Sequence, residues 1–255
     1  MALHDLIIVE SKAPNDKKRI LIALKGLHTK IKSDSKHVTG SARKTNIDLT
    51  KGLIQDSFYS VTPSLASSGS GLITTFENDL RRSKMESARF EFKQGILNLY
   101  QELGINKGLL DKVVTIICSM ANIGSTSLGG NIYFGISDCQ KDSDRISDIF
   151  DIRPIRFADK DIYGIDHEAE KLSIDPERYV KKIIQHIQNS KLTDNMKSSV
   201  LNQIEHFNYN GRTILRIGVP KQNRISFVGE DTYMRIDSNT HKAKPIQIAE
   251  IVGRF

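Results

Sequence analysis

Four side chains in two segments of the chain could carry out chemistry on a phosphate. Glu86 and Glu91 are five residues apart, Lys93 follows two residues later, and Asp138 comes directly after a short apolar segment. Carboxylates that are brought together disfavour their own ionisation unless a cation compensates, and Mg²⁺ and Mn²⁺ prefer such oxygen ligands. The metal could activate water beside a scissile phosphate, while the lysine stabilises charge on the phosphoryl oxygens.

The segment that holds Glu91 and Lys93 is predicted to be a strand. Residues 89–93 alternate strictly between charged and aromatic side chains, and alternation places successive side chains on opposite faces. The two phenylalanines should face the core, and the charged side chains should share the other face. Glu86 has the parity of the phenylalanines, so it must lie on a turn before the regular strand.

Asp138 follows a segment that is predicted to be a buried strand. Residues 131–136 are nearly all apolar, as in a central strand, and a glycine pair precedes them. The helix predicted over residues 108–121 comes before this strand, with apolar side chains at helical spacing. If the strands over 89–93 and 131–136 are neighbours, the acidic residues can converge at one edge of the sheet.

The remaining patterns predict an α/β or α+β fold, in which helices flank a mixed sheet. A second helix should begin after Asp175-Pro176, where an N-cap residue precedes proline in the first turn. Asn210-Gly211 predicts a hairpin between two apolar segments. A short strand over residues 233–236 and a helix from Pro245 complete the order.

Positive charge is concentrated in the first third of the chain. Residues 1–84 carry 14 Lys and Arg against 8 Asp and Glu, whereas residues 85–255 carry 23 against 22. Such a field favours a polyanionic partner, nucleic acid before membrane, although a basic helix face also serves solubility. Residues 1–80 are therefore predicted to be a basic extension of a domain over residues 81–255.

Within this extension, residues 15–32 have the periodicity of an amphipathic, basic helix. Residues 33–48 are polar and basic without periodicity, and residues 64–71 form a Ser/Gly stretch typical of a flexible connection. The apolar segments of the chain are much shorter than the roughly 20 residues of a membrane-spanning helix. With two cysteines and no secretory signal at the N-terminus, a cytoplasmic protein with no membrane partner is predicted.

Three blocks of sequence carry a family resemblance. They are Met85-Glu-Ser-Ala-Arg-Phe-Glu-Phe-Lys93, then Ser119-Met-Ala-Asn122 with Leu128-Gly-Gly-Asn-Ile-Tyr-Phe-Gly-Ile-Ser-Asp138, and finally Thr232-Tyr-Met-Arg-Ile-Asp-Ser-Asn-Thr240. In order and spacing the blocks resemble the signature segments of the Schlafen AlbA_2 family, over about residues 81–255. The resemblance implies a compact α/β domain and, for Schlafen-type members, a metal-dependent endoribonuclease that cuts tRNA or rRNA. The acidic residues of those nucleases fall on Glu86, Glu91 and Asp138 here, and Lys93 is the matching lysine.

The chain departs from the family pattern in two respects. It inserts Ile-Gly-Ser-Thr-Ser-Leu between Asn122 and Gly129, where the family usually turns more tightly. Vertebrate Schlafens join two such lobes and carry a zinc site, whereas this chain has one lobe and two cysteines. A two-lobed RNA cleft would therefore have to be rebuilt by a homodimer.

Contacts with a nucleic-acid backbone are predicted at several basic and aromatic positions. Tyr233 and Arg235 leave the same face of the predicted strand and could hold phosphates, and the alternative is an arginine that pairs with a local carboxylate. The other predicted contacts are Arg89 and, on the basic helix, Lys17, Lys18, Arg19 and Lys25.

Three functions are compatible with these patterns. The first is a metal-dependent endoribonuclease that uses Mg²⁺ or Mn²⁺ on structured RNA, as in a toxin-like or defence effector, with DNA as a further partner. The second is a non-catalytic DNA- or RNA-binding or transcriptional-regulator module, in which the carboxylates form salt bridges with Arg89 and Lys93. The third is a regulatory domain with an ATP-like ligand. Retention of all three carboxylates favours the nuclease.

Two weaker motifs are interpreted as structural. The glycines of residues 124–130 are not followed by the Gly-Lys-Ser/Thr of a phosphate loop, and a turn before a buried strand explains them. Asp142 and Asp144 lack the glycine and terminal glutamate of a calcium loop, so they are interpreted as a solvated loop.

Overall fold

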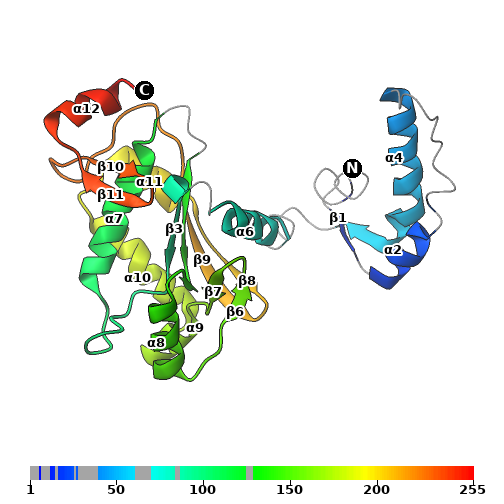
Figure 1. The fold of residues 1–255 in the computed structure, drawn as a ribbon, viewed down its shortest axis with the longest axis horizontal. Helices are drawn as coiled ribbons and strands as arrows, with labels where there is room; N and C mark the ends of the chain where they lie inside the picture. The colour runs from blue at the N-terminus through cyan, green and yellow to red at the C-terminus, as the bar shows by residue number, and fades with distance from the viewer. Residues whose placement is uncertain are drawn as a thin grey trace. The chain divides into compact units, whose positions relative to one another are not determined.

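A computed structural model describes residues 6, 12–14, 17–25, 27, 40–60, 70–83, 87–124 and 129–255. The chain divides into two compact units, Met1–Thr75 and Phe76–Phe255 (Figure 1). The division falls within helix α6 (Ser70–Arg82), which also contains the boundary near residue 80 that the sequence predicts.

A four-stranded mixed sheet lies at the centre of the larger unit. Its strand order is β3 (Phe90–Lys93), β4 (Gly130–Phe134), β9 (Arg212–Val219) and β8 (Ile204–Tyr209). β3 runs parallel to β4 with Glu91 opposite Ile132, and the other two pairs are antiparallel. The predictions that the two strands are neighbours, that β4 is central and that Asn210-Gly211 forms a hairpin are confirmed.

Helices α7 (Lys107–Ala121) and α10 (Pro176–Asn189) cover one face of this sheet, with α11 (Asp194–Leu201) beside them (Figure 1). The side chains of Asn106 and Asp175 cap α7 and α10, each accepting a hydrogen bond from a first-turn N–H, at 3.0 and 2.7 Å. The apolar stripes of both helices join the sheet in the main hydrophobic core. Both predicted helices are confirmed.

The C-terminal part of α6 packs against the opposite face of the sheet. Phe76 is fully buried, and its ring lies 5.1–5.3 Å, centroid to centroid, from the rings of Tyr133, Phe207 and Tyr209. Asp79 accepts a hydrogen bond of 2.7 Å from the Tyr133 hydroxyl. With helices on both faces of a mixed sheet, the predicted α+β class is confirmed.

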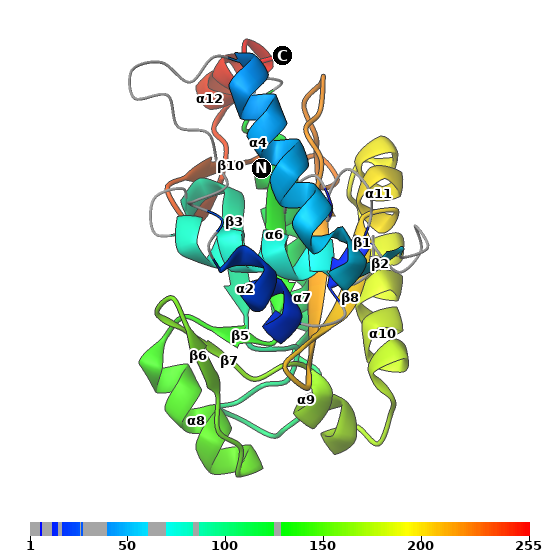
Figure 2. The same ribbon diagram turned by 90° about the vertical axis from the view of Figure 1, so that its right-hand side faces the viewer.

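The chain leaves the main sheet at Gly135, which divides the strand predicted over residues 131–136. Gly135 has a φ of +94°, and a Cβ here would lie 2.7 Å from the Cα of Gly164, so a side chain does not fit. Beyond it, β5 (Ile136–Ser137), β7 (Lys160–Ile162) and β6 (Ile155–Phe157) form a smaller antiparallel sheet. Helix α9 (Asp166–Lys171) follows β7 (Figure 2).

Residues 140–150 form helix α8 (Gln140–Phe150), so the solvated loop predicted around Asp142 and Asp144 is wrong. Ile146 is fully buried and packs with Leu99 and Tyr163. The helix has a narrow apolar stripe on an otherwise acidic and polar surface, which conceals its periodicity in the sequence.

Strands β10 (Tyr233–Ile236) and β11 (Asn239–Lys242) form a separate antiparallel hairpin that lies against α7. Helix α12 (Pro245–Val252) follows. Met234, Ala243 and Ile251 form a small core between these elements. The strand and the helix predicted here are confirmed, whereas β11 was not predicted.

The described part of the smaller unit contains a two-stranded sheet packed with helices. Strands β1 (Lys12–Pro14) and β2 (Phe58–Ser60) pair antiparallel, and α2 (Lys17–Leu24) packs with α4 (Gly40–Ile54) and the short helix η2 (Gln55–Ser57). α4 overlaps the segment 33–48 that shows no periodicity. Among the α4 residues whose side chains are described, Ile54 is buried, and it lies beyond that segment. Within the described ranges, no helix is long and apolar enough to cross a membrane.

Candidate functional site

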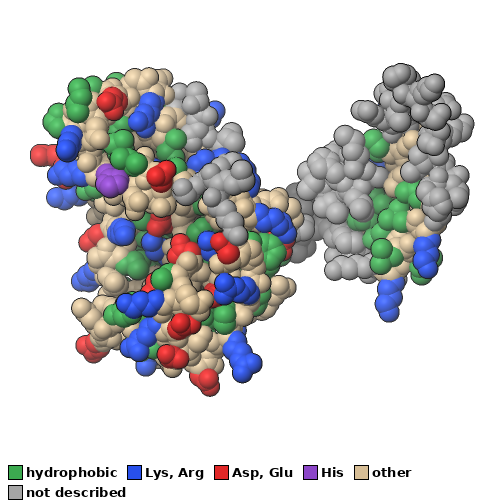
Figure 3. Space-filling view, in the orientation of Figure 1, with side chains coloured by type: hydrophobic (Ala, Val, Ile, Leu, Met, Phe, Trp, Pro, Cys, Tyr) green, Lys and Arg blue, Asp and Glu red, His purple; other side chains and the backbone are tan. Residues whose placement is uncertain are grey.

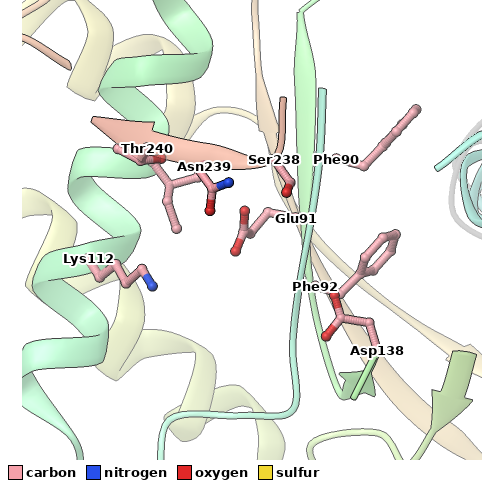
Figure 4. Close-up of a pocket in the computed structure, with 9 residues that line it drawn as sticks. Phe90, Glu91, Phe92, Lys112, Asp138, Ser238, Asn239 and Thr240 are labelled. Atoms are coloured by element: carbon pink, nitrogen blue, oxygen red, sulfur yellow. The ribbon is translucent and has the colours of Figure 1, made fainter. Parts of the chain in front are cut away.

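A pocket of about 260 Å³ lies beside β3, on the side that faces α7 (Figure 4). β3 contributes Glu91, α7 contributes Lys112, the turn between β10 and β11 contributes Ser238, and the start of β11 contributes Asn239. Asp138, which follows β5, lines the same pocket. Two of the three predicted acidic residues therefore line one cavity. Figure 4 draws the Glu91 carboxylate on the α7 side of β3 and the Asp138 side chain on the side of Phe92.

The alternation of β3 determines the direction of Glu91. Phe90 and Phe92 are buried, and their rings lie on the opposite side of the strand from the Glu91 carboxylate (Figure 4). Because Glu91 is in register with Ile132, a core residue on the α7 face, its side chain points to that face at the edge of the sheet. The predicted division of β3 into an aromatic and a charged face is confirmed.

Two cations hold the Glu91 carboxylate. The Lys93 ammonium lies 2.5 Å from Oε1, and Arg235 Nη1 donates a hydrogen bond of 2.9 Å to Oε2. Relative exposure is 14% for the Glu91 side chain, 15% for Lys93 and 1% for Arg235. The carboxylate is thus fixed in position and neutralised by the protein itself.

Arg235 contacts three residues that line the pocket. Besides Glu91, its guanidinium donates to the backbone oxygen of Phe90 and to Thr240 Oγ1, both at 3.2 Å. This geometry favours the alternative that the sequence left open, an arginine that pairs with a local carboxylate. The main role of Arg235 in this arrangement is to position Glu91.

A buried asparagine fixes β10, and thereby Arg235, to the end of α7. Asn122 is fully buried, and its amide nitrogen donates to Tyr233 O, Thr232 Oγ1 and Ser226 O at 2.9–3.0 Å. Its Oδ1 accepts a hydrogen bond of 2.8 Å from Ser226 N. This network holds the start of β10 against the C-terminal end of α7.

Asn122→Ala is expected to lower the free energy of unfolding by about 1–3 kcal/mol, because it leaves a buried N–H without an acceptor. The measurement is urea denaturation monitored by circular dichroism. Asn223→Ala, at an exposed position of the preceding loop, is the matched control and should unfold like the parent. Equal stability of all three proteins would show that the network does not hold β10.

Asp138 is exposed and, among the described residues, no side chain forms an ion pair or hydrogen bond with its carboxylate. Glu86, the third predicted ligand, lies outside the described residues. Within those residues no three His, Cys, Asp or Glu side chains are close enough to hold a metal ion. The described part of the site therefore contains two of the predicted acidic ligands, and the three-carboxylate arrangement stays a prediction.

Lys112 is a site residue that the sequence reasoning missed. Its exposed side chain extends from α7 into the pocket, one helical turn before Ile116, which also lines it (Figure 4). In the described part of the chain, its ammonium has no carboxylate or hydrogen-bond partner. The signal in the sequence is a lysine one turn from an apolar residue, on a helix expected to face the charged side of the strand.

The donor set of the pocket fits a hard divalent cation. Glu91 and Asp138 offer carboxylate oxygens, and Asn239, Ser238 and Thr240 offer amide or hydroxyl oxygens. Each Glu91 oxygen accepts one protein hydrogen bond and retains a second lone pair for a ligand. Mg²⁺ and Mn²⁺ suit such oxygen donors.

The other predicted nucleic-acid contacts lie in different surroundings. Arg89 Nε donates a hydrogen bond of 2.8 Å to the backbone oxygen of Gly129. Tyr233 is partly buried against the main core and lines a pocket on the other side of α7 from Glu91. Figure 3 shows basic and acidic side chains interspersed on the face of the larger unit that it draws.

The basic residues of the smaller unit lie on or beside α2. Lys18, Arg19 and Lys25 are exposed, and Lys17 begins the helix, with its side chain outside the described part. The contacts of these residues with RNA stay a prediction.

The glycine pair before β4 is a site of close backbone packing. Gly129 has a φ of +80°, and a Cβ there would lie 2.5 Å from the backbone oxygen of Val219. A backbone that is already in contact with β9 at this point favours the turn that the sequence analysis preferred over a phosphate loop.

The fold and the pocket together define an α+β domain with a carboxylate held by cations at a sheet edge. The family model described as Schlafen, AlbA_2 matches residues 86–244, more than half of the chain, and the chain belongs to this family. The family is associated with nucleic-acid-related function and includes nucleases.

Two further comparisons add little to this assignment. The crystal structure of the DIP2311 protein from Corynebacterium diphtheriae is similar at 14% sequence identity and a TM-score of 0.41, over 71% of this chain and 28% of that chain. No curated protein matches this chain.

Proposed function

We propose that this protein is a metal-dependent endoribonuclease that cleaves structured RNA, such as tRNA or rRNA, as a toxin-like or defence effector. The observation that carries the proposal is the pocket shared by Glu91, Asp138 and Lys112, in a chain whose family includes nucleases. Two carboxylates and an exposed ammonium suit a site that must handle both a divalent cation and a phosphate.

In this proposal Glu91 and Asp138, together with Glu86, hold Mg²⁺ or Mn²⁺. When bound, the cation lowers the pKa of water and neutralises charge on the phosphate. Arg235 keeps Glu91 in its place, so the carboxylate is oriented before the substrate arrives. Lys112 binds a non-bridging phosphate oxygen, and Lys93, at the end of β3, stabilises the charge that develops there.

The proposal also includes how RNA is held. The exposed basic residues of the smaller unit would bind phosphates without reading sequence. A homodimer would supply the second lobe of the cleft, through a contact that uses the same surface on both copies.

A non-catalytic DNA- or RNA-binding module is the second candidate. The ion pairs of Glu91 with Lys93 and Arg235 favour it, since a carboxylate neutralised by protein cations also serves a structural role. Cleavage by the purified protein distinguishes the two candidates.

Asp138→Asn is expected to reduce the rate of RNA cleavage strongly. Loss of a residue that only supports a metal ligand costs roughly 10- to 100-fold, and loss of a ligand itself should cost more. The substitution removes a charged oxygen ligand at an exposed position, so folding should be unchanged. The measurement is cleavage of total tRNA with Mn²⁺, and the parent should lose activity when a chelator replaces the metal. Asp148→Asn, exposed on α8 and away from the pocket, is the matched control.

Cleavage by Asp138→Asn at the rate of the parent would contradict the assignment of this carboxylate. If the parent itself cleaves no RNA with either metal, the binding-module candidate replaces the nuclease.

A further inference from the structure

We infer that a second pocket, which adjoins the first at Lys112, binds one unpaired nucleobase of the RNA strand, with Tyr100 as the stacking surface. The inference rests on the proposed function and adds its substrate class, an RNA whose cleaved nucleotide has an unpaired neighbour. The pocket has a volume of about 400 Å³ and lies between the N-terminal end of α7 and the loop that follows β3.

The two pockets are arranged as neighbouring subsites. Lys112 lines both of them. The ion pair between Glu91 and Lys93 connects them as well, since Glu91 lines the first and Lys93 the second. A phosphate bound at Lys112 would therefore have its own nucleoside, or the next one, within the second pocket.

Tyr100 is an aromatic surface exposed to solvent at this place. Its relative exposure is 52%, and it is the one aromatic residue among the large hydrophobic side chains that are exposed in the described part of the chain. An exposed ring in a pocket beside cationic groups is the usual surface on which proteins stack single-stranded bases.

The Tyr100 ring is held in place before any ligand binds. Its hydroxyl donates a hydrogen bond to Asp142 on α8, which raises the pKa of Tyr100 to about 12 and keeps the hydroxyl protonated. Its backbone N–H donates to the Asn98 side chain at 3.1 Å. The Lys141 ammonium lies 5.0 Å from the ring centroid and covers one ring face. A base would therefore stack on the opposite face. A fixed ring loses little entropy on binding.

The surroundings of Tyr100 select an unpaired base rather than a duplex. A base can reach the ring face only when it is unstacked from its neighbours, which is the state of bases in loops, bulges and ends of structured RNA. The Lys141 ammonium lies beside the ring and Lys112 lines the same pocket, which also contains the Asp142 carboxylate. The two ammonium groups would attract the phosphates on either side of that base.

The test is binding of fluorescein-labelled RNA by anisotropy, with a chelator present so that no strand is cut. Tyr100→Leu removes the ring and is expected to weaken binding of a single-stranded RNA by about 5- to 150-fold. Tyr100→Phe keeps the ring but loses the bond to Asp142, so it should retain most of the affinity. Binding of a blunt RNA duplex should be the same for all three proteins.

Three outcomes would overturn the inference: unchanged single-strand binding by Tyr100→Leu, an equal loss for the duplex, or a loss for Tyr100→Phe as large as for Tyr100→Leu. Circular dichroism in urea checks that the Tyr100→Leu protein is folded, as its exposed position predicts. Because cleavage is not measured, the outcome is independent of the nuclease. A ring-dependent affinity in a protein that cuts no RNA would support the base site and reject the proposed chemistry.

Discussion

Glu91→Leu is expected to lower the free energy of unfolding by about 3–5 kcal/mol, because it removes the carboxylate that neutralises the buried Arg235 guanidinium. Glu91→Gln keeps one carbonyl acceptor and should lose less. Chemical denaturation at neutral pH measures both. Lys242→Met is the control in the same hairpin. It breaks an exposed ion pair with Asp231, and exposed pairs contribute little, so its unfolding should match that of the parent.

The double variant Glu91→Leu/Arg235→Met tests whether the charge left behind causes the loss. Replacing both partners of a buried pair with apolar side chains is often neutral, so this variant should recover much of the stability. If the double variant instead loses as much stability as the two single variants together, the unpaired charge is not the cause of the loss. The prediction also determines how cleavage by Glu91 variants is interpreted, because lost activity would combine chemistry with unfolding. Asp138, which has no such structural partner among the described residues, gives the cleaner test of the chemistry.

Acid is expected to destabilise the protein through His167. This residue is 7% exposed on α9, and among the described residues neither ring nitrogen has a hydrogen-bond partner. Burial lowers the pKa of His167 from 6.5 to about 4, while Asp166 raises it and Arg212 lowers it by smaller amounts. The Phe150 ring, 4.5 Å away centroid to centroid, provides no acceptor for a proton.

The direction in which pH changes the free energy of unfolding follows from the lowered pKa of His167. Between pH 6.5 and about 4 the unfolded chain binds a proton that the folded one does not, so this contribution is complete above pH 6.5 and is lost as pH falls. The full loss is roughly 3 kcal/mol. His167→Phe keeps an aromatic ring and removes the titration. The difference between parent and variant in free energy of unfolding, measured from pH 7.5 to 4 in steps, isolates this histidine from neighbouring carboxylates. A difference that does not change with pH would contradict the prediction.

The sequence predicted the strands and helices in which apolar side chains recur regularly on the face that is buried and polar side chains on the other face. The alternation of residues 89–93 gave the direction of Glu91, and the apolar segment before Asp138 gave the neighbouring strand. Helix α8 was missed because its acidic surface outweighs a short apolar stripe, and the period of a helix is hard to detect when few residues are buried.

The contacts of the pocket were harder to predict than its acidic members. Arg235 lies 144 positions from Glu91 in the chain, and local patterns contain no information about which distant cation a carboxylate will meet. Lys112 lies on a helix whose apolar stripe was recognised, but its rotation relative to β3 depends on how α7 packs between the sheet and the β10–β11 hairpin. Those contacts are tertiary, and only the assembled fold determines them.

The turn at Gly135 has a consequence for how the two carboxylates are spaced. Glu91 belongs to the main sheet, whereas Asp138 follows β5 of the smaller one, and the two sheets join where Gly135 N donates to Lys93 O at 2.9 Å and Gly135 O accepts from Tyr163 and Gly164. The separation of the acidic groups therefore depends on the backbone angle at one residue rather than on the regular spacing of a single sheet. A side chain at position 135 would displace this junction, because a Cβ there meets the backbone of Gly164, and would change the span between the two acidic groups.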